Sequence, residues 1–241
     1  MRGRRHHAQL LHALSTTPAD LVLLTGDYMD RPGNERAALD VLRDILEAAR
    51  ARLGIFGIAG NHDSTVFMRL ARGETRMEWL NNQAVDLLVP AAGAGGESNT
   101  GTPLRLIGLS WPEDVVAAVL DEPPTPAFTI ALAHSPTAII PAGEFGIPLL
   151  FAGHTHGGQV RISGALAPHT SSDLPPDLAS GLLRYRRTLA VISRGLGEAV
   201  FPGLRFNCPR QAPLITLRSA PFASNDTSQL WDQQVVRSQT W

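Results

Sequence analysis

Five side chains of the kinds that bind metal ions each follow a short apolar segment of the chain. They are Asp27 in LLTGD, Asn61 in GIAGN, His134 in IALAH, and His154 and His156 in FAGHTH. Imidazole and carboxylate groups suit zinc, iron and manganese ions, and an amide oxygen also tolerates harder ions. Glycine stands directly before Asp27, Asn61 and His154, where it lets the backbone turn sharply and approach a site closely. These residue types in these places indicate a metal site.

The apolar segments before these residues have the length and composition of buried β-strands. Strands are predicted at 20–27, 53–61, 85–90, 103–110, 127–134, 147–154, 188–195 and 212–219. Helices are predicted at 6–16, 34–50 and 111–120. Strands interleaved with helices indicate an α/β fold. Because ligands collect outside the carboxyl ends of the strands in such sheets, the metal-binding side chains can converge on one edge.

The helix predicted at 34–50 has an apolar face and a suitable first residue. Asn34 is a common N-cap type. The apolar residues at helical spacing are Ala38, Val41, Leu42, Ile45 and Ala49. The glycine-rich stretch 91–101 lacks the spacing of a phosphate-binding loop and is interpreted as a connection.

Length, charge and cysteine content restrict the class of protein. The chain has 241 residues, a net charge of −1 and one cysteine, so an intrachain disulfide is impossible. The near-neutral charge argues against a nucleic-acid partner. No apolar run approaches the roughly 20 residues that span a bilayer, and the basic start lacks the apolar stretch of a signal peptide. We therefore expect a cytoplasmic protein or one peripheral to a membrane, with a domain at 1–219 and a loosely ordered polar tail at 220–241.

Four motifs in this order resemble those of the calcineurin-like metallophosphoesterases. They are GDYMD at 26–30, GNHD at 60–63, the histidine before Ser-Pro at 134–136, and GHTHGGQ at 153–159. SRGLG at 193–197 and RFN at 205–207 are similar to a bacterial subgroup, in which some members are membrane-associated and some act on lipid-linked diphosphates. The resemblance covers about residues 8–218, and the ordered set is much more specific than any one motif.

The resemblance implies a fold, a cofactor and a reaction. The fold would be a four-layer α/β/β/α sandwich that holds two divalent metal ions of the manganese, iron or zinc type. The reaction would be the hydrolysis of a phosphomonoester, phosphodiester or pyrophosphate bond by a metal-activated water, in a phosphorylated small-molecule or lipid-linked substrate. Asp27 would bridge both metals and His156 would bind the first one. The second metal would be completed by Asn61, His134 and His154.

The resemblance also implies roles for three residues that do not bind metal. His62 would protonate the leaving oxygen or stabilise the phosphoryl charge, and Asp63 would orient His62. Asp30 would lie behind the site as a supporting acid, although it could equally cap the start of the following helix. His169, in a loop rich in proline and serine, is interpreted as a surface residue, with a substrate-side role as the alternative.

The sequence departs from the family pattern in one place. The family opens with a strand that ends in Asp-x-His and supplies two ligands to the first metal, and no Asp-x-His occurs here. His6 and His7 are poor substitutes, because adjacent side chains diverge on a strand and basic neighbours repel a cation. We therefore expect the chain as written to lack the first strand and to bind at most one metal tightly.

Two interpretations follow from this departure. The chain is either a metallophosphoesterase given without its first strand, or a truncated or degenerate protein that binds a single metal and is catalytically impaired. His6, His7 and His12 are expected to face solvent, and Trp79 and Trp111 to be core or interface residues. The chain contains no G-x-S-x-G or H-E-x-x-H motif, so two other common hydrolase types are not indicated.

Overall fold

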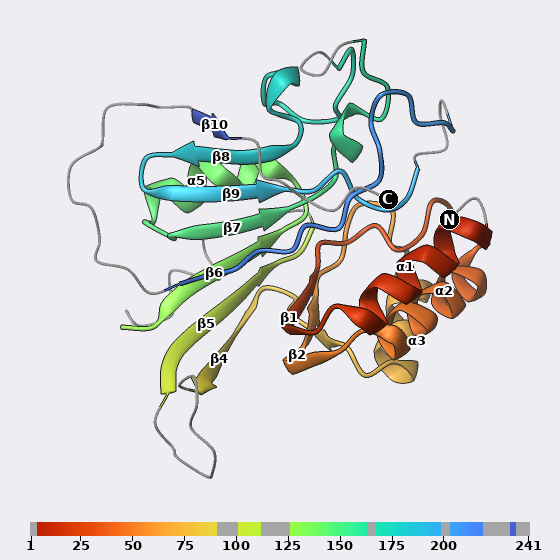
Figure 1. Cartoon of the computed structure of the whole chain (residues 1–241), viewed down its shortest axis with the longest axis horizontal. Coiled ribbons are helices and arrows are strands. Elements are labelled where there is room, and N and C mark those ends of the chain that lie inside the picture. Colours follow the sequence, from red (N-terminus) through yellow and green to blue (C-terminus); the bar gives the residue numbers. More distant parts are fainter. Residues whose placement is uncertain are drawn as a thin grey trace. The chain divides into compact units, whose positions relative to one another are not determined.

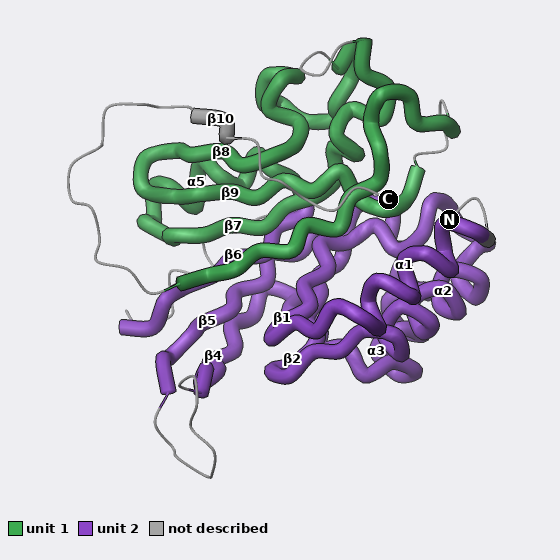
Figure 2. The backbone as a smooth tube through the Cα atoms, viewed as in Figure 1, with its two compact units in different colours: residues 1–2, 135–241 green, residues 3–134 purple. Residues whose placement is uncertain are grey.

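The computed structural model describes residues 4–90, 101–111, 126–162, 167–198, 203–218 and 232–234. The chain divides into two compact units (Figure 2). Residues 3–134 form the amino-terminal unit, and the carboxy-terminal unit consists of residues 135–241 together with residues 1–2. The fold is of the mixed α/β class that the sequence predicts.

The amino-terminal unit contains a small parallel sheet that helices cover. The sheet has the order β1 (Ala19–Leu24), β2 (Ala51–Gly57) and β3 (Glu78–Trp79), so β1 forms one edge. Figure 1 shows α1 (Arg4–Thr16), α2 (Glu35–Ala48) and α3 (Thr65–Glu74) beside β1 and β2. The helix α3 was not predicted, although Ser64 is a suitable N-cap and its hydroxyl accepts a hydrogen bond from the N–H of Phe67 at 3.1 Å.

The core under these helices differs in one respect from the sequence interpretation. The buried residues of α2 and its C-cap are Leu39, Leu42, Leu46 and Ala49, so the buried face is rotated from the predicted one. Ala38, Val41 and Ile45, which were predicted to face the core, are only half-buried. Asn34 occupies the predicted N-cap position, but its side chain makes no capping hydrogen bond.

The predicted burial of one tryptophan and three histidines of this unit is confirmed only in part. Trp79 packs against the core and meets the ring of Tyr28 edge-on at 5.2 Å, as predicted for a core residue. His12 is exposed as expected, but His6 and His7 are half-buried. The Nε2 atom of His7 lies 3.4 Å from a carboxylate oxygen of Asp44 on α2, so helix packing explains its burial.

Three further strands belong to the amino-terminal unit. β4 (Gln83–Pro90) pairs antiparallel with β5 (Gly101–Leu109), and β5 pairs parallel with β6 (Phe128–Ala133). The residues at the end of β6 are fully buried, which explains their continuous apolar composition. The helix predicted at 111–120 and most of the connection at 91–101 lie outside the described residues.

The carboxy-terminal unit contains a mixed sheet. Its order is β10 (Asp232–Gln234), β8 (Gly181–Tyr185), β9 (Thr188–Ile192) and β7 (Leu149–Ala152), with a parallel pairing only between β7 and β9. The short helix α5 (Ile139–Glu144) follows the 3₁₀ helix η1 (Pro136–Ala138). Further 3₁₀ turns are η2 (His156–Gly158) and η3 (Pro176–Leu178).

Most predicted strands are confirmed with small shifts of their ends, and one is wrong. Residues 212–218 form no strand. Pro213 offers no N–H to a ladder, and the N–H of Gln211 donates instead to the carbonyl of Gly195 at 3.0 Å. The predicted tail at 220–241 lies outside the described residues apart from β10. Among the helices that the structure describes, none has both the length and the apolar character needed to span a lipid bilayer.

Candidate metal site

Three predicted ligands meet inside the amino-terminal unit. Asp27 follows β1, Asn61 follows β2, and His134 directly follows β6. The Nε2 atom of His134 lies 2.8 Å from Oδ1 of Asn61 and 3.3 Å from Oδ2 of Asp27. The residues therefore converge as the positions of their strand ends predicted.

The hydrogen bonding of His134 shows what these three groups can hold. Its Nδ1 atom lies 2.7 Å from the carbonyl oxygen of Thr25, which can only accept, so Nδ1 carries a hydrogen. In the neutral ring Nε2 then presents a lone pair to the oxygens of Asn61 and Asp27. Three electron-pair donors that face one another around a fully buried imidazole repel unless a cation or a proton lies among them.

This donor set fits a divalent metal ion. Imidazole, carboxylate and amide oxygen are accepted together by zinc, manganese and iron ions. Histidine ligands commonly donate their other ring N–H to a backbone carbonyl, as His134 does to Thr25. Asp27 and His134 offer ligand atoms within 4.8 Å of each other, a separation that one ion can bridge.

Asp27 is held in an uncommon backbone conformation. Its φ angle is 59°, in the left-handed region that non-glycine residues seldom adopt outside functional sites. Its Oδ1 atom accepts a hydrogen bond from the N–H of His62 at 3.0 Å, which leaves Oδ2 directed at His134. Burial acts to raise the pKa of the Asp27 carboxyl, but the hydrogen bond and charge of a protonated His134, together with the N–H and charge of His62, outweigh it and lower the pKa. A cation at this place, whether a proton on His134 or a metal ion, therefore favours the carboxylate form of Asp27.

Two glycines allow the loops after β1 and β2 to touch. A Cβ atom on Gly26 would lie 2.6 Å from the N atom of Gly60, and the φ angle of Gly26 is 92°. A Cβ atom on Gly60 would lie 2.6 Å from both the N atom of Asp27 and Cε1 of His134. A side chain at Gly26 would thus push the two loops apart, and one at Gly60 would displace Asp27 and His134, which explains the glycine before Asp27 and before Asn61.

Asp63 fixes the backbone under the site and does not contact His62. Its Oδ2 atom accepts hydrogen bonds from the N–H groups of Asp27 at 2.9 Å and Gly60 at 2.8 Å. Its Oδ1 atom accepts one from the N–H of Tyr28 at 2.8 Å. Burial is the main cause that raises the pKa of Asp63 to about 6, and the negative charge of Asp27 raises it further. The three N–H donors act in the opposite direction but do not outweigh these effects. The expected contact that would orient His62 is therefore replaced by a backbone clamp.

His62 is oriented by a different residue. Its Nδ1 atom lies 3.0 Å from the backbone carbonyl of Asp30, so the ring donates this N–H and presents Nε2 outward. The carboxylate of Asp30 instead accepts a hydrogen bond from the side-chain amide of Asn34 at 2.8 Å. Asp30 was predicted either to support the site or to cap the following helix. Its carboxylate bonds locally at the start of α2, and its backbone carbonyl orients His62.

One aromatic contact at the site was missed by sequence reasoning. The ring of Trp111 meets the ring of His134 edge-on, with 6.0 Å between centroids and 83° between planes. Trp111 is 43% exposed, so of the two predicted places, core or interface, it does not lie in the core. No sequence pattern indicates this pairing, because it depends on where the end of β5 meets the end of β6.

The remaining predicted ligands lie in a turn of the carboxy-terminal unit. Positive φ angles occur at His154 (66°), His156 (51°), Gly157 (64°), Gly158 (80°) and Gln159 (51°). Thr155 stabilises this turn, because its hydroxyl donates to the carbonyl of Ala179 at 2.6 Å and accepts from the N–H of Gly157 at 3.2 Å. Both histidines therefore have left-handed backbone conformations, like Asp27.

His169 is a surface residue of the same unit, as predicted. It is exposed, and its Nε2 atom lies 3.1 Å from the hydroxyl of Ser171 in the same loop.

Comparison with known proteins agrees with the geometry of the site. Residues 4–158 match the family model of the calcineurin-like phosphoesterases. The chain is 29% identical over 203 residues to the phosphodiesterase YaeI of Escherichia coli, covering 82% of this chain and 70% of that protein. It is 26% identical over 215 residues to the uncharacterized metallophosphoesterase YkuE of Bacillus subtilis, covering 86% of this chain and 70% of the relative. No solved structure matches the chain significantly.

Replacement of Gly60 by alanine is expected to weaken metal binding without removing a ligand. The added methyl group would push against Asp27 and His134, so Mn²⁺ should bind about 10–100-fold more weakly, as measured by calorimetric titration. Gly73→Ala is the control, because a Cβ atom there meets nothing within 4 Å. Unchanged Mn²⁺ affinity in Gly60→Ala would show that the two loops need not touch.

Asp63 is expected to make the stability of the metal-free protein depend on pH. Its pKa rises from an ordinary value of 3.8 to about 6 in the folded protein. The folded state therefore binds this proton more tightly, and the stability that the proton contributes is lost as pH rises through about 6. The free energy of unfolding should fall by up to about 3 kcal/mol between pH values of about 4 and 7. Asp27 has a lowered pKa and titrates below this range.

Urea denaturation in the presence of a chelator measures this effect. Asp63→Asn should be less stable overall, because an amide oxygen cannot accept all three N–H bonds. In this variant the free energy of unfolding should also depend less steeply on pH, because the titrating carboxyl is gone. Equal slopes in the two proteins would contradict the prediction. Asp40→Asn, at an exposed position on α2, should retain the wild-type slope.

Proposed function

The chain belongs to the calcineurin-like phosphoesterase family, whose members are metal-dependent phosphoesterases, and from that premise we propose that it hydrolyses phosphodiester bonds. The observation that carries the proposal is the convergence of Asp27, Asn61 and His134 on one point. The name of the Escherichia coli relative supports a phosphodiester over a phosphomonoester as the substrate. The substrate class would be a phosphorylated small molecule, with lipid-linked phosphates included.

We assign the ligands of two divalent ions on the family motifs and on the donor set. One ion would be held by Asp27, Asn61, His134 and His154. The other would be held by Asp27 and His156 alone and would bind more weakly, since the Asp-x-His motif that completes this site in the family does not occur in the sequence. Bound there, the ions would lower the pKa of a water molecule and neutralise the charge on the phosphoryl oxygens. The Thr25 carbonyl would keep His134 in the tautomer that binds metal, and the His62 N–H would keep one oxygen of Asp27 from turning away.

His62 would serve as the general acid. The Asp30 carbonyl accepts the N–H of its Nδ1 atom, so a proton on Nε2 is the one available for transfer to a leaving oxygen. The exposed position of the ring suits a group that must reach substrate. Its assignment as an acid and not as a ligand follows from this orientation together with the family motif.

A substrate panel with defined metal content tests the proposed function. The metal-free protein would be loaded with Mn²⁺, Zn²⁺ or Fe²⁺ and assayed with bis-p-nitrophenyl phosphate, p-nitrophenyl phosphate and a nucleotide pyrophosphate. Hydrolysis of the diester that a chelator abolishes and Mn²⁺ restores is the expected result. Asn61→Ala and His134→Ala should lose both metal and activity. Metal binding with no hydrolysis of any substrate would favour the alternative of a catalytically impaired metal-binding protein.

Removal of the His62 ring is expected to separate binding from turnover. His62→Ala should retain its metal by elemental analysis, while kcat falls about 10²–10⁴-fold because the proton donor is gone. His12→Ala, an exposed histidine on α1, is the matched control and should have wild-type kcat. Loss of metal from His62→Ala would show that His62 belongs to the ligand set.

A further inference from the structure

The turn that carries His156 needs an external support. His156 has a φ angle of 51°, and the left-handed conformation continues through Gly157, Gly158 and Gln159. Non-glycine residues in this region cost on the order of 1–3 kcal/mol each and persist only where surrounding structure fixes them. The carbonyl of His156 accepts a hydrogen bond within the turn from the N–H of Gln159 at 3.1 Å. What else holds this carbonyl decides where the imidazole points.

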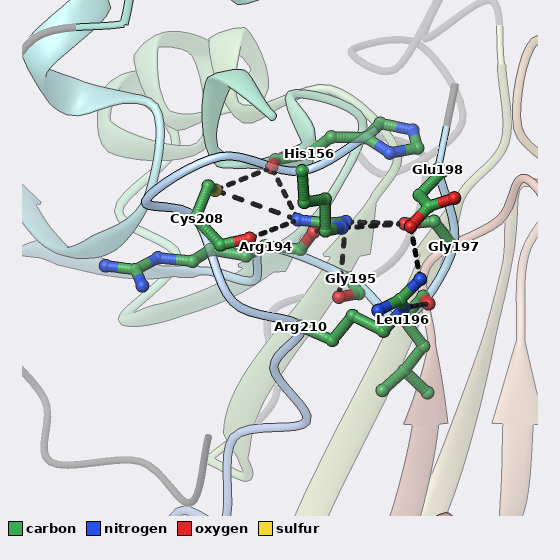
Figure 3. Close-up of polar contacts among 9 residues, drawn as sticks. His156, Arg194, Gly195, Leu196, Gly197, Glu198, Cys208 and Arg210 are labelled. Carbon is green, nitrogen blue, oxygen red and sulfur yellow. Dashed lines mark hydrogen bonds and ion pairs between the residues drawn. The ribbon is translucent and has the colours of Figure 1, made fainter. Parts of the chain in front are cut away.

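Arg205 holds the carbonyl of His156 from outside the turn. Its Nη1 atom donates to that oxygen at 3.0 Å and to the carbonyl of Cys208 at 3.3 Å. Its Nη2 atom donates to the carbonyls of Arg194 at 2.7 Å and Gly197 at 2.6 Å, and Nε donates to Gly197 at 3.0 Å. Figure 3 shows His156, Cys208, Arg194 and Gly197, whose carbonyls accept these bonds, close together in space. One side chain thus ties three separate segments together through their backbone oxygens.

The position of Arg205 is itself fixed by backbone pairing. The N–H of Phe206 donates to the carbonyl of Gln159 at 3.0 Å, and the N–H of Arg161 donates to the carbonyl of Phe206 at 3.0 Å. A short parallel bridge between Val160 and Phe206 results. The residue next to Arg205 is therefore anchored to the end of the same turn whose carbonyl Arg205 holds.

Cys208 adds a second contact to the same carbonyl. Its Sγ atom lies 3.3 Å from the carbonyl oxygen of His156 and 3.4 Å from that of Gly157, and the residue is 1% exposed. Because a thiol is a weak donor, we expect it to contribute less than the charged guanidinium.

We propose that Arg205 is a positioning residue, which holds the backbone of His156 so that the imidazole is oriented to bind metal. This inference rests on the proposed function, in which His156 is a metal ligand. The planar guanidinium has five N–H donors in a fixed fork, and its contacts to several carbonyls use that geometry. Lysine would keep the charge but could not reproduce the set of bonds. Arg205 acts on the metal only through His156.

Arg210 provides a matched control in the same region. Its Nε atom donates to the carbonyl of Leu196 at 3.0 Å, and its guanidinium forms an ion pair with Glu198 (Figure 3). Arg210 therefore supports the segment that Arg205 also contacts, but among the described residues it forms no hydrogen bond or ion pair with His156. A general loosening of this segment would appear in variants of both arginines, whereas an effect on His156 would appear only in variants of Arg205.

Binding of Mn²⁺ to the full-length protein, followed by the electron paramagnetic resonance signal of free Mn²⁺, tests the proposal. The Mn²⁺ binding that the wild-type protein shows and His156→Ala does not is the binding that depends on His156. Arg205→Ala should weaken Mn²⁺ at that site about 10–100-fold, the usual effect of losing a group that orients a ligand. Arg210→Ala should leave it within about threefold, and both variants should keep the site that depends on Asn61 and His134.

A double-mutant cycle shows whether Arg205 acts through His156. In the His156→Ala background, Arg205→Ala should cause no further loss of Mn²⁺ affinity or of diesterase activity. Guanidinium ion added to Arg205→Ala should restore part of the affinity, and it should have no such effect on His156→Ala. Additive losses, or equal losses in Arg205→Ala and Arg210→Ala, would overturn the proposal.

Two further variants apply if Arg205→Ala does not fold. Arg205→Lys retains the aliphatic stem and should still weaken the His156-dependent site, and Cys208→Ala should weaken it by about threefold or less. Wild-type affinity in both folded variants would also overturn the proposal. If His156→Ala itself changes neither Mn²⁺ binding nor activity, the ligand assignment in the proposed function fails. If His156→Ala has an effect and the Arg205 variants have none, only the positioning role fails.

Discussion

The metal-binding geometry of the amino-terminal unit depends on one hydrogen bond, from Nδ1 of His134 to the carbonyl of Thr25. It fixes the tautomer of a ring that is completely buried, and so it places an electron pair among two oxygens. A buried polar group without a partner costs about 1–3 kcal/mol, and whole domains are stable by only about 5–15 kcal/mol. A site of this kind is therefore tolerable only because a cation or a proton can satisfy it.

The surrounding backbone is arranged to keep these groups close despite that cost. Two glycines remove the side chains that would separate the loops after β1 and β2. The carboxylate of Asp63 then joins those loops, because it accepts N–H groups from both of them. In the carboxy-terminal unit, guanidinium and thiol groups perform the corresponding task by donating to backbone carbonyls. Anionic support of N–H groups and cationic support of carbonyls are two solutions to the same problem of an irregular backbone.

The sequence predicted which residues converge at the site better than it predicted their hydrogen-bond partners. The convergence of Asp27, Asn61 and His134 was predictable, because each follows a buried strand whose apolar residues are plain in the sequence. The partners of Asp63 and His62 were not, because apart from the N–H of Gly60 they are backbone groups about 30 or more residues away in sequence, whose positions depend on the folded loops.

The wrong predictions about the fold have similar causes. Either of two apolar faces on α2 has helical spacing, and only the sheet beneath determines that Leu39 and Leu46 are buried instead of Ala38 and Ile45. The segment at 212–218 has the apolar residues of a strand but forms none, and the N–H of Gln211 just before it donates to the carbonyl of Gly195. Periodicity therefore predicts that a helix or strand can be buried on one side. Tertiary contacts decide whether the element forms and which of its faces is buried.

The clamp made by Asp63 has a consequence for how loss-of-function data on this chain should be interpreted. Within GNHD, Asn61 is proposed to bind metal, while the side chain of Asp63 binds backbone N–H groups and so holds the shape of the loops. A screen that scores surviving activity would rank the two residues alike. Pairing each activity score with the abundance of folded protein would separate them, since a lost ligand leaves soluble, inactive protein and a lost clamp lowers the amount that folds.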